Sequence, residues 1–350
     1  MPDFRRLRIL ISRLSAIGDC ILTVPVLNAL RDHFPNAFLA WIVERPVAPL
    51  LEGHSALDEL IVVPRGCLKS PKTVWQLRRR LRNLQFDVTI DPQSLTKSAV
   101  LARLSGARQR IGFAGEDGRE LSRWLNNELI SRSAEHMVDR SLELLGPLGI
   151  SNAASRFELP VYEAASEAMR QFLARSGVGE RFALINVGAG WPSKLWPAEG
   201  FGVVASHLSR THGLPSVVIW AGEQERDWAQ RAVETAAGTA TLAPQTSLTE
   251  LAELARRAVL FVGCDTGPMH ISAAVGTPCV ALFGPTLPSV CGPYGEPHLT
   301  VQAFHQKSAG SRQQRSADNL AMRAIQTPDV CEACDTVVTQ IESPATKDAA

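Results

Sequence analysis

Short apolar runs alternate with segments of helical periodicity along the first half of the chain. Four apolar runs of strand length are bounded by polar or turn residues, at positions 7–11, 38–43, 59–63 and 86–90. The spacing of apolar positions predicts helices between and after them, at residues 21–34, 46–52, 75–84 and 98–104. Strands that alternate with helices at this spacing are typical of a parallel sheet with crossover helices.

The same alternation begins again in the second half. Strands are predicted at residues 182–187, 216–220, 259–262 and 279–283. Helices are predicted at 198–211, 225–237, 249–257 and 268–275, with a polar loop at 302–316 and a last helix at 327–341. The predicted fold class is therefore α/β, with two Rossmann-like, doubly wound parallel-sheet domains that face a central cleft. Such folds bind ligands at the carboxyl ends of their strands.

The length of the chain agrees with two domains, because 350 residues exceed one ordinary core. We place the first domain at residues 1–160, the second at 161–326, and a closing helix and tail at 327–350. Hydrophobic residues make up 45% of the chain and charged residues 20%, as in globular proteins that dissolve in water. No run approaches the roughly 18 apolar residues that span a bilayer, and no cleavable leader is evident. We therefore expect a cytoplasmic protein.

Seven cysteines are scattered along the chain rather than arranged as a disulfide framework. Cys331 and Cys334 form an isolated CxxC without a second pair. Structural or incidental cysteines are the favoured interpretation, and metal or redox chemistry is the alternative.

The net charge of +1 conceals an asymmetry between the halves. Residues 1–160 carry a net charge of +5 and residues 161–350 a net charge of −4. Seven basic residues, with no acidic residue among them, occupy the segment 65–82: Arg65, Lys69, Lys72, Arg78, Arg79, Arg80 and Arg82. Such a run is commonly a solvated helix face, and it also suits an anionic partner or membrane surface.

The segment 259–286, VLFVGCDTGPMHISAAVGTPCVALFGPT, carries the strongest chemical signal. A buried strand runs into Asp265, Thr266 and Gly267, and the proline that follows suits the first position of a helix. Free backbone N–H groups at a helix start, with the helix dipole behind them, form an anion site. His270 lies one turn into the same helix. The pattern predicts a phosphate site, whereas a capped helix with a satisfied histidine is the alternative.

A second loop, NVGAGWPSKLWP at residues 186–197, follows the first predicted strand of the second half. The small residues Gly188, Ala189 and Gly190 permit a ligand to touch the backbone. Lys194 supplies a mobile cation that can neutralise a diphosphate leaving group, although an ordinary surface lysine is the alternative. The sequence contains no Walker A motif, no GxGxxG at a helix start and no DxD motif. We therefore expect a diphosphate to be held by amides, a hydroxyl and an ammonium rather than by Mg²⁺.

Gly18 and Asp19 follow the first predicted strand, in the segment LSAIGDCILTVPVLNAL at 14–30. One interpretation is that the aspartate caps the helix that follows. The other is that it is a general base at the carboxyl end of a strand, with Gly18 leaving room for a sugar.

With these loops the chain resembles the ADP-heptose:lipopolysaccharide heptosyltransferases, which have the GT-B fold. The resemblance runs over nearly the whole chain, and D-T-G-x-x-H-x-x-A-A from Asp265 to Ala274, followed by F-G-P-T, carries it most specifically. It is also carried by SRLSAIGDCILTVPVL, by IDPQSLTKSAVLARLSGARQRIGF and by MRAIQTPDV. The block from Asp91 to Ser98 is more similar to the first heptosyltransferase of the inner core, whereas GAGWPSK is closer to the second.

The resemblance implies a division of labour. The second domain would bind the donor, ADP-L-glycero-β-D-manno-heptose, and the first would bind a Kdo sugar on lipid A. Donor-binding residues would be Ala189, Gly190, Lys194, Glu225, Asp265, Thr266, Gly267 and His270. Asp19 would be the catalytic base of an inverting displacement, with Arg13, Gly18 and Lys97 on the acceptor side. No metal, no cofactor and no nucleic-acid partner is implied, and residues 65–82 would contact the inner-membrane surface at its cytoplasmic face.

The sequence is also compatible with three other functions. A different GT-B glycosyltransferase would use another nucleotide-sugar or acceptor. A nucleotide-sugar epimerase would turn over the donor alone. A nucleotide-sugar binding protein would bind without transfer, because a fold does not decide function.

Overall fold

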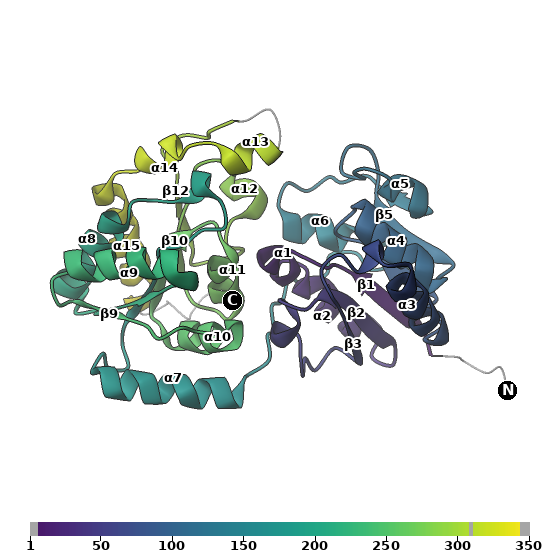
Figure 1. Ribbon diagram of the computed structural model, residues 1–350, viewed down its shortest axis with the longest axis horizontal. Coiled ribbons are helices and arrows are strands. Elements are labelled where there is room, and N and C mark those ends of the chain that lie inside the picture. The colour runs from purple at the N-terminus through teal and green to yellow at the C-terminus, as the bar shows by residue number, and fades with distance from the viewer. Residues whose placement is uncertain (1–5, 308–310, 344–350) are drawn as a thin grey trace, which may run out of the picture. The chain divides into compact units, whose positions relative to one another are not determined.

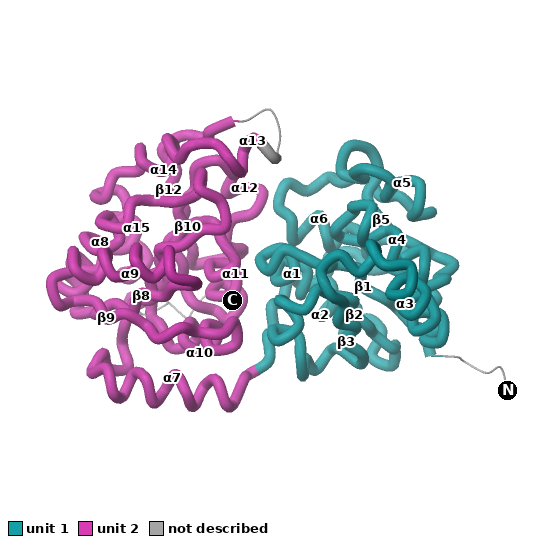
Figure 2. The backbone as a smooth tube through the Cα atoms, viewed as in Figure 1, with its two compact units in different colours: residues 1–160 teal, residues 161–350 magenta. Residues whose placement is uncertain are grey.

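The chain divides into two compact units, Met1–Pro160 and Val161–Ala350 (Figure 2). The structure is a computed structural model that describes residues 6–307 and 311–343. In the described part of the chain, no helix has both the length and the apolar character that a bilayer crossing requires.

Unit 1 is a doubly wound sheet with helices on both faces (Figure 1). Its strands run parallel in the order β3-β2-β1-β4-β5-β6. In chain order its elements are β1 (Arg8–Ser12), α1 (Ile17–Ile21), α2 (Val24–His33), β2 (Phe38–Glu44), η1 (Ala48–Leu50), β3 (Glu59–Val63), η2 (Cys67–Lys69), α3 (Pro71–Asn83), β4 (Val88–Ile90), α4 (Thr96–Ser105), β5 (Gln109–Phe113), α5 (Ser122–Leu125), β6 (Glu128–Ile130), α6 (Met137–Glu143) and η3 (Gly146–Leu148).

Unit 2 repeats the same winding, with parallel strands in the order β12-β11-β10-β7-β8-β9. In chain order its elements are α7 (Glu163–Ser176), β7 (Ala183–Asn186), η4 (Pro192–Lys194), α8 (Ala198–His212), β8 (Ser216–Ile219), α9 (Gly222–Thr235), β9 (Ala240–Leu242), α10 (Leu248–Arg257), β10 (Leu260–Cys264), α11 (Gly267–Ala274), β11 (Cys279–Leu282), α12 (Pro288–Cys291), β12 (Leu299–Val301), α13 (Ser311–Ser316), α14 (Leu320–Arg323) and α15 (Thr327–Glu342).

The central strands are buried on both faces, which explains why their sequences are unbroken runs of apolar residues. In unit 2, alternate residues such as Val262 and Ile185 pack against α8, α9 and α15, while α10 and α11 lie on the other face (Figure 1). The last helix, α15, buries Val330, Cys334 and Val338 in this core. The prediction of an α/β fold with two doubly wound parallel sheets is confirmed.

In each sheet the strand order reverses at one point. The loops that carry the predicted site residues leave the sheets beside these points. The reversal lies between β1 and β4 in unit 1 and between β7 and β10 in unit 2. Loops that leave the carboxyl ends of two such neighbours diverge to opposite faces and open a crevice, the usual ligand site of this architecture.

Several predicted boundaries were wrong. The helix predicted at 21–34 is α2, which begins only at Val24, and a separate short helix that was not predicted, α1, ends at Ile21; Pro25 has no N–H to donate to the carbonyl of Ile21, so the two do not join. The helix predicted at 46–52 is only the short 3₁₀ turn η1, and α13 forms within the predicted loop at 302–316. The tail from residue 344 lies outside the described residues.

Candidate functional site

The loops after β7 and β10 bring Lys194 and Asp265 together in unit 2. Asp265 follows β10 directly, and Lys194 ends the 3₁₀ turn η4 in the loop after β7. Lys194 Nζ lies 2.5 Å from Asp265 Oδ2, and the two side chains are 12% and 5% exposed. The expected mobile cation is thus a nearly buried ammonium that is fixed by an ion pair.

Asp265 is the centre of a polar network. Thr286, in the turn after β11, donates its hydroxyl to Asp265 Oδ2 at 2.6 Å. His270 Nε2 lies 3.5 Å from Oδ1 of the same carboxylate. Burial alone would raise the pKa of Asp265, but the histidine contact and the charge of Lys194 hold it well below its usual range. The carboxylate therefore stays ionised and orients the ammonium, which keeps further N–H donors for a ligand.

The first turn of α11 is available to an anion. Thr266 is the N-cap residue, but it makes no side-chain cap bond, and its hydroxyl donates to the carbonyl of Cys264 at 3.1 Å. The amide of Asn186, the last residue of β7, reaches Thr266 Oγ1 at 3.3 Å. Because the side chain leaves the first-turn amides of α11 uncapped, Gly267 opens a helix whose dipole favours negative charge.

Two buried polar atoms beside this network have no hydrogen-bond partner among the described residues, Ser193 Oγ and His270 Nδ1. Ser193 precedes Lys194, and His270 lies on α11. Since buried polar atoms are nearly always paired, each of these atoms is a position that can take a hydrogen bond from water or from a polar ligand.

Glu225 lies beside Gly188 of the loop that follows β7. It lies in the first turn of α9, and its Oε2 accepts the backbone N–H of Ala221 at 2.8 Å. Burial raises the pKa of Glu225. A Cβ on Gly188 would lie 2.2 Å from this carboxyl, so only glycine permits the approach. Ala189 and Gly190 continue the loop, and a Cβ at Gly190 would meet open space.

In unit 1, Asp19 lies inside a helix, not before one. The helix α1 begins at Ile17, so Gly18 and Asp19 are in its first turn, and Gly18 is buried. Asp19 Oδ2 accepts the backbone N–H of Ala16 at 3.3 Å, as a residue at the third helical position can. Its side chain is 40% exposed. Within the described part of the chain, Oδ1 accepts no hydrogen bond, which leaves it available.

Arg13 fixes the orientation of this carboxylate. Its Nη2 lies 2.7 Å from Asp19 Oδ2, and its Nη1 donates to the carbonyl of Pro92 at 2.8 Å. The Arg13 side chain is only 4% exposed. Arg13 thus joins the loop after β1 to the loop after β4, and it supports Asp19 rather than pointing freely outward.

Lys97 reaches the same loop from α4. Its Nζ donates to Ser15 Oγ at 2.7 Å and lies 3.1 Å from Oε1 of the buried Glu44. Gln93 bridges two backbone groups of this loop, accepting from Leu14 N and donating to Ser15 O, each at 3.0 Å. The loop that carries Asp19 is therefore held from two sides.

Asp91 stands directly after β4 and is fully buried. It accepts hydrogen bonds from Ser94 N at 2.9 Å and from Asn126 Nδ2 at 3.0 Å. Burial raises the pKa of Asp91 to about 6 despite these donors. Asp91 therefore shapes the turn that presents Gln93, and it contacts no solvent.

Two groups of predicted residues thus lie together, one in each unit. In unit 2, Lys194, Asp265, Thr266 and His270 meet at the strand-order reversal, and Gly267 begins the adjacent helix. Sequence reasoning assigned no role to Thr286 or Asn186. Asn186 ends a buried strand, and Thr286 lies in the turn that follows β11; a polar residue in the F-G-P-T segment was the available signal for Thr286.

Comparisons with known proteins agree on one family. Residues 74–321 match the profile of glycosyltransferase family 9 (heptosyltransferase). The chain is 29% identical over 304 residues to lipopolysaccharide heptosyltransferase 1 of Pseudomonas aeruginosa, covering 83% of this chain and 82% of that protein. It is 26% identical over 328 residues to lipopolysaccharide heptosyltransferase 3 of Escherichia coli, covering 91% and 95%.

Solved structures show the same architecture. The E. coli heptosyltransferase WaaC with ADP matches at a TM-score of 0.73 and 25% identity, covering 94% of this chain and 99% of that one. A glycosyl transferase family 9 protein from Veillonella parvula matches at a TM-score of 0.78 and 24% identity, covering 95% and 97%. The profile match spans well over half of the sequence, and the chain belongs to glycosyltransferase family 9, the heptosyltransferases.

Proposed function

We propose that the protein transfers a heptose from ADP-heptose to the inner core of lipopolysaccharide by an inverting, metal-independent displacement. The membership in a heptosyltransferase family and the names of its relatives support the reaction class. The observation that carries the donor side is the fixed ammonium of Lys194 beside the uncapped first turn of α11.

The donor diphosphate is assigned to unit 2. The first-turn amides of α11, the Thr266 hydroxyl and the ammonium of Lys194 hold the phosphate oxygens, and Gly267 permits their close approach. As the bond to the sugar breaks, negative charge grows on the leaving diphosphate, and preorganised donors stabilise it. Asp265 and His270 position these donors, Ala189 and Gly190 leave the backbone open, and Glu225 faces the nucleoside.

Metal independence follows from the same donor set. In metal-dependent transferases a divalent cation balances the diphosphate charge. Here a fixed ammonium and a helix N-terminus supply positive charge at that position, so no cation is required in this mechanism.

The acceptor is assigned to unit 1. Asp19 takes the proton of the attacking hydroxyl through Oδ1, while Arg13 holds Oδ2. A β-configured donor and an α-linked product require one in-line displacement with inversion. Gly18, without a side chain, leaves room beside the base, and Lys97 contacts an anionic Kdo carboxylate.

A panel of nucleotide-sugars tests the donor assignment. We expect ADP-heptose at 100 times its Kd to add about 2.7 kcal/mol to the free energy of unfolding, with or without EDTA. UDP-, GDP- and CMP-sugars should give smaller shifts in a thermal-shift assay. A preference for another base, or a shift that EDTA abolishes, would contradict the proposal. Product formed from the donor alone would indicate an epimerase.

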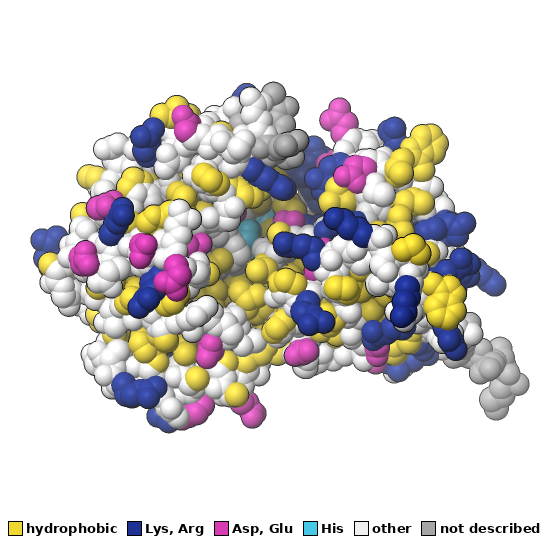
Figure 3. Space-filling model, in the orientation of Figure 1, with side chains coloured by type: hydrophobic (Ala, Val, Ile, Leu, Met, Phe, Trp, Pro, Cys, Tyr) yellow, Lys and Arg dark blue, Asp and Glu magenta, His cyan; other side chains and the backbone are white. Residues whose placement is uncertain are grey.

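The basic segment 65–82 is proposed to dock the enzyme on anionic head groups at the cytoplasmic face of the inner membrane. All seven of its Lys and Arg side chains are exposed, and Lys and Arg gather over the side of unit 1 that carries α3 (Figure 3). Leu77 and Leu81 anchor α3 in the core, while Trp75 is 61% exposed beside Arg79. An exposed aromatic side chain among cations is typical of a membrane-surface helix.

Vesicle co-sedimentation tests this docking. Each basic residue near an anionic surface contributes about 1 kcal/mol, so the double variant Arg78→Gln/Arg79→Gln should bind anionic vesicles about 30-fold more weakly. The matched control Arg175→Gln/Arg231→Gln removes two exposed arginines of unit 2 and should bind like the wild type. Equal binding by both variants, or binding that 0.5 M salt leaves unchanged, would rule out electrostatic docking by α3, since added salt at about this level screens exposed charges.

A further inference from the structure

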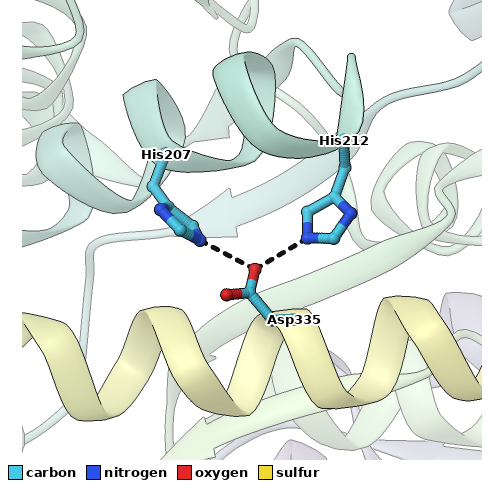
Figure 4. Close-up of side chains that lie close together, drawn as sticks. All are labelled: His207, His212 and Asp335. Atoms are coloured by element: carbon cyan, nitrogen blue, oxygen red, sulfur yellow. Dashed lines mark hydrogen bonds and ion pairs between the residues drawn. The ribbon is translucent and has the colours of Figure 1, made fainter.

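Two histidines and an aspartate converge on the face of unit 2 where α8 meets α15. His207 and His212 are on α8, and Asp335 is on α15 (Figure 4). Both Nε2 atoms lie 2.7 Å from the same carboxylate oxygen, Asp335 Oδ1. The three ligand atoms all lie within 4.8 Å of one another. None of these residues belongs to the donor or acceptor groups described above.

The helices that carry these side chains are well anchored. Leu208 of α8 and Val338 of α15 are fully buried in one core cluster, so the two helix axes are fixed relative to each other. His212 is the last residue of α8, and Gly213 follows at a φ of +62°, a left-handed conformation that ends the helix. The backbone therefore presents the three side chains together without any ligand.

The side chains themselves retain room to adjust. They are 25%, 12% and 39% exposed for His207, His212 and Asp335 respectively. Zinc binds imidazole nitrogen and carboxylate oxygen at about 2.0–2.2 Å in a tetrahedron, which puts ligand atoms about 3.3 Å apart. The present 2.7 Å contacts must open by about 0.6 Å to admit such an ion. Both contacts end on Asp335, the most exposed of the three side chains, so small rotations of its carboxylate can make that change.

The donor set is that of a transition metal. Two neutral imidazoles and one carboxylate suit Zn²⁺ and its neighbours in the first row, whereas Mg²⁺ and Ca²⁺ prefer oxygen ligands only. Each ring now donates its Nε2 proton to Asp335. A metal would take the Nε2 lone pair instead, so that proton moves to Nδ1 or to solvent.

We propose that His207, His212 and Asp335 bind one divalent transition-metal ion such as Zn²⁺, with water in the fourth position, and that the ion fastens α15 to α8. Cys331 stands one turn before Asp335 on α15. Its thiol is not among the converging ligand atoms. The site is separate from the diphosphate site and independent of the proposed metal-free transfer.

Metal titration of tag-free protein that has been stripped with a chelator tests the proposal. We expect one Co²⁺ or Zn²⁺ per chain, a tetrahedral Co²⁺ absorption spectrum, and a higher Tm with metal. His207→Gln and His212→Gln should each weaken binding by roughly 100-fold, because each removes one of three protein ligands. Asp335→Asn should also weaken binding, since it removes the ligand charge.

Matched controls separate this site from other candidate ligands. Cys331→Ser and His33→Gln, an exposed histidine of unit 1, should bind like the wild type. Glutamine retains a side-chain N–H, and the metal-free Tm of each variant shows whether the fold is intact. The proposal is overturned if the stripped wild type shows no saturable binding, if both folded histidine variants bind normally, or if Cys331→Ser abolishes binding.

Discussion

Replacing Asp19 by asparagine should reduce kcat for heptose transfer by about 10³-fold while leaving donor affinity nearly unchanged. An amide cannot accept the proton that the attacking hydroxyl releases. Asparagine has the same shape, and its carbonyl oxygen can still accept the N–H of Ala16. The fold should therefore persist, with a small loss from the weakened contact to Arg13. The measurement is kcat in steady-state assays and Kd for ADP-heptose by thermal shift.

The alternative role of Asp19 as a helix cap gives a different result. A cap would affect the free energy of unfolding by about 1 kcal/mol and would leave kcat intact. Asp32→Asn is the matched control, because Asp32 is an exposed carboxylate of α2 that also pairs with an arginine, Arg156, at 2.7 Å. Wild-type turnover in Asp19→Asn would show that the carboxylate only caps α1.

Most strands of both sheets could be predicted from sequence, including the edge strand β3, while the interior strand β5 and the other three edge strands could not. Long apolar runs mark β1, β2, β7 and β10 because these strands are buried on both faces. The edge strands β6, β9 and β12 have three residues each and are only partly buried. Their pattern of apolar and polar residues therefore cannot be distinguished from that of a loop. Tertiary pairing, not local preference, forms them.

Some residues of the candidate site could likewise be predicted from the sequence, and others could not. Loops that follow buried strands could be found, so Asp265, Thr266 and Asp19 were placed at strand ends. The pairing of Lys194 with Asp265 depends on the path of a loop, and 71 residues separate the two along the chain. The cluster of His207, His212 and Asp335 is harder still, since α15 packs beside α8 only in the folded unit. Contacts of this kind leave no local sequence pattern.

Replacing Lys194 by methionine should weaken donor binding by roughly 100-fold and lower the free energy of unfolding by about 3 kcal/mol. Methionine fills similar space without charge, so Asp265 loses the ammonium 2.5 Å away and remains a buried carboxylate with Thr286 and His270. The measurements are the Kd for ADP-heptose and unfolding in urea. Lys72→Met, at an exposed lysine of α3, is the matched control and should change neither.

The loss of unfolding free energy in Lys194→Met should depend on pH in a definite direction. In the wild type the pKa of Asp265 is held below its usual range, so its contribution to stability is present above the unfolded pKa and is lost as the pH falls. Without Lys194 the pKa of Asp265 loses one of the two groups that lower it and rises above its wild-type value, although His270 remains, so protonation relieves the unpaired charge at a higher pH than in the wild type. The stability difference between wild type and variant should therefore be largest at neutral pH and shrink toward pH 4, the region of an unperturbed aspartate pKa.

A double variant separates stability from ligand binding. Lys194→Met/Asp265→Asn has no buried charge at this pair, so it should recover most of the free energy of unfolding that Lys194→Met loses. It should not recover donor affinity, because the ammonium that faces the diphosphate is still missing. Recovery of both quantities would mean that Lys194 acts only by balancing Asp265, and that the donor phosphates are held elsewhere.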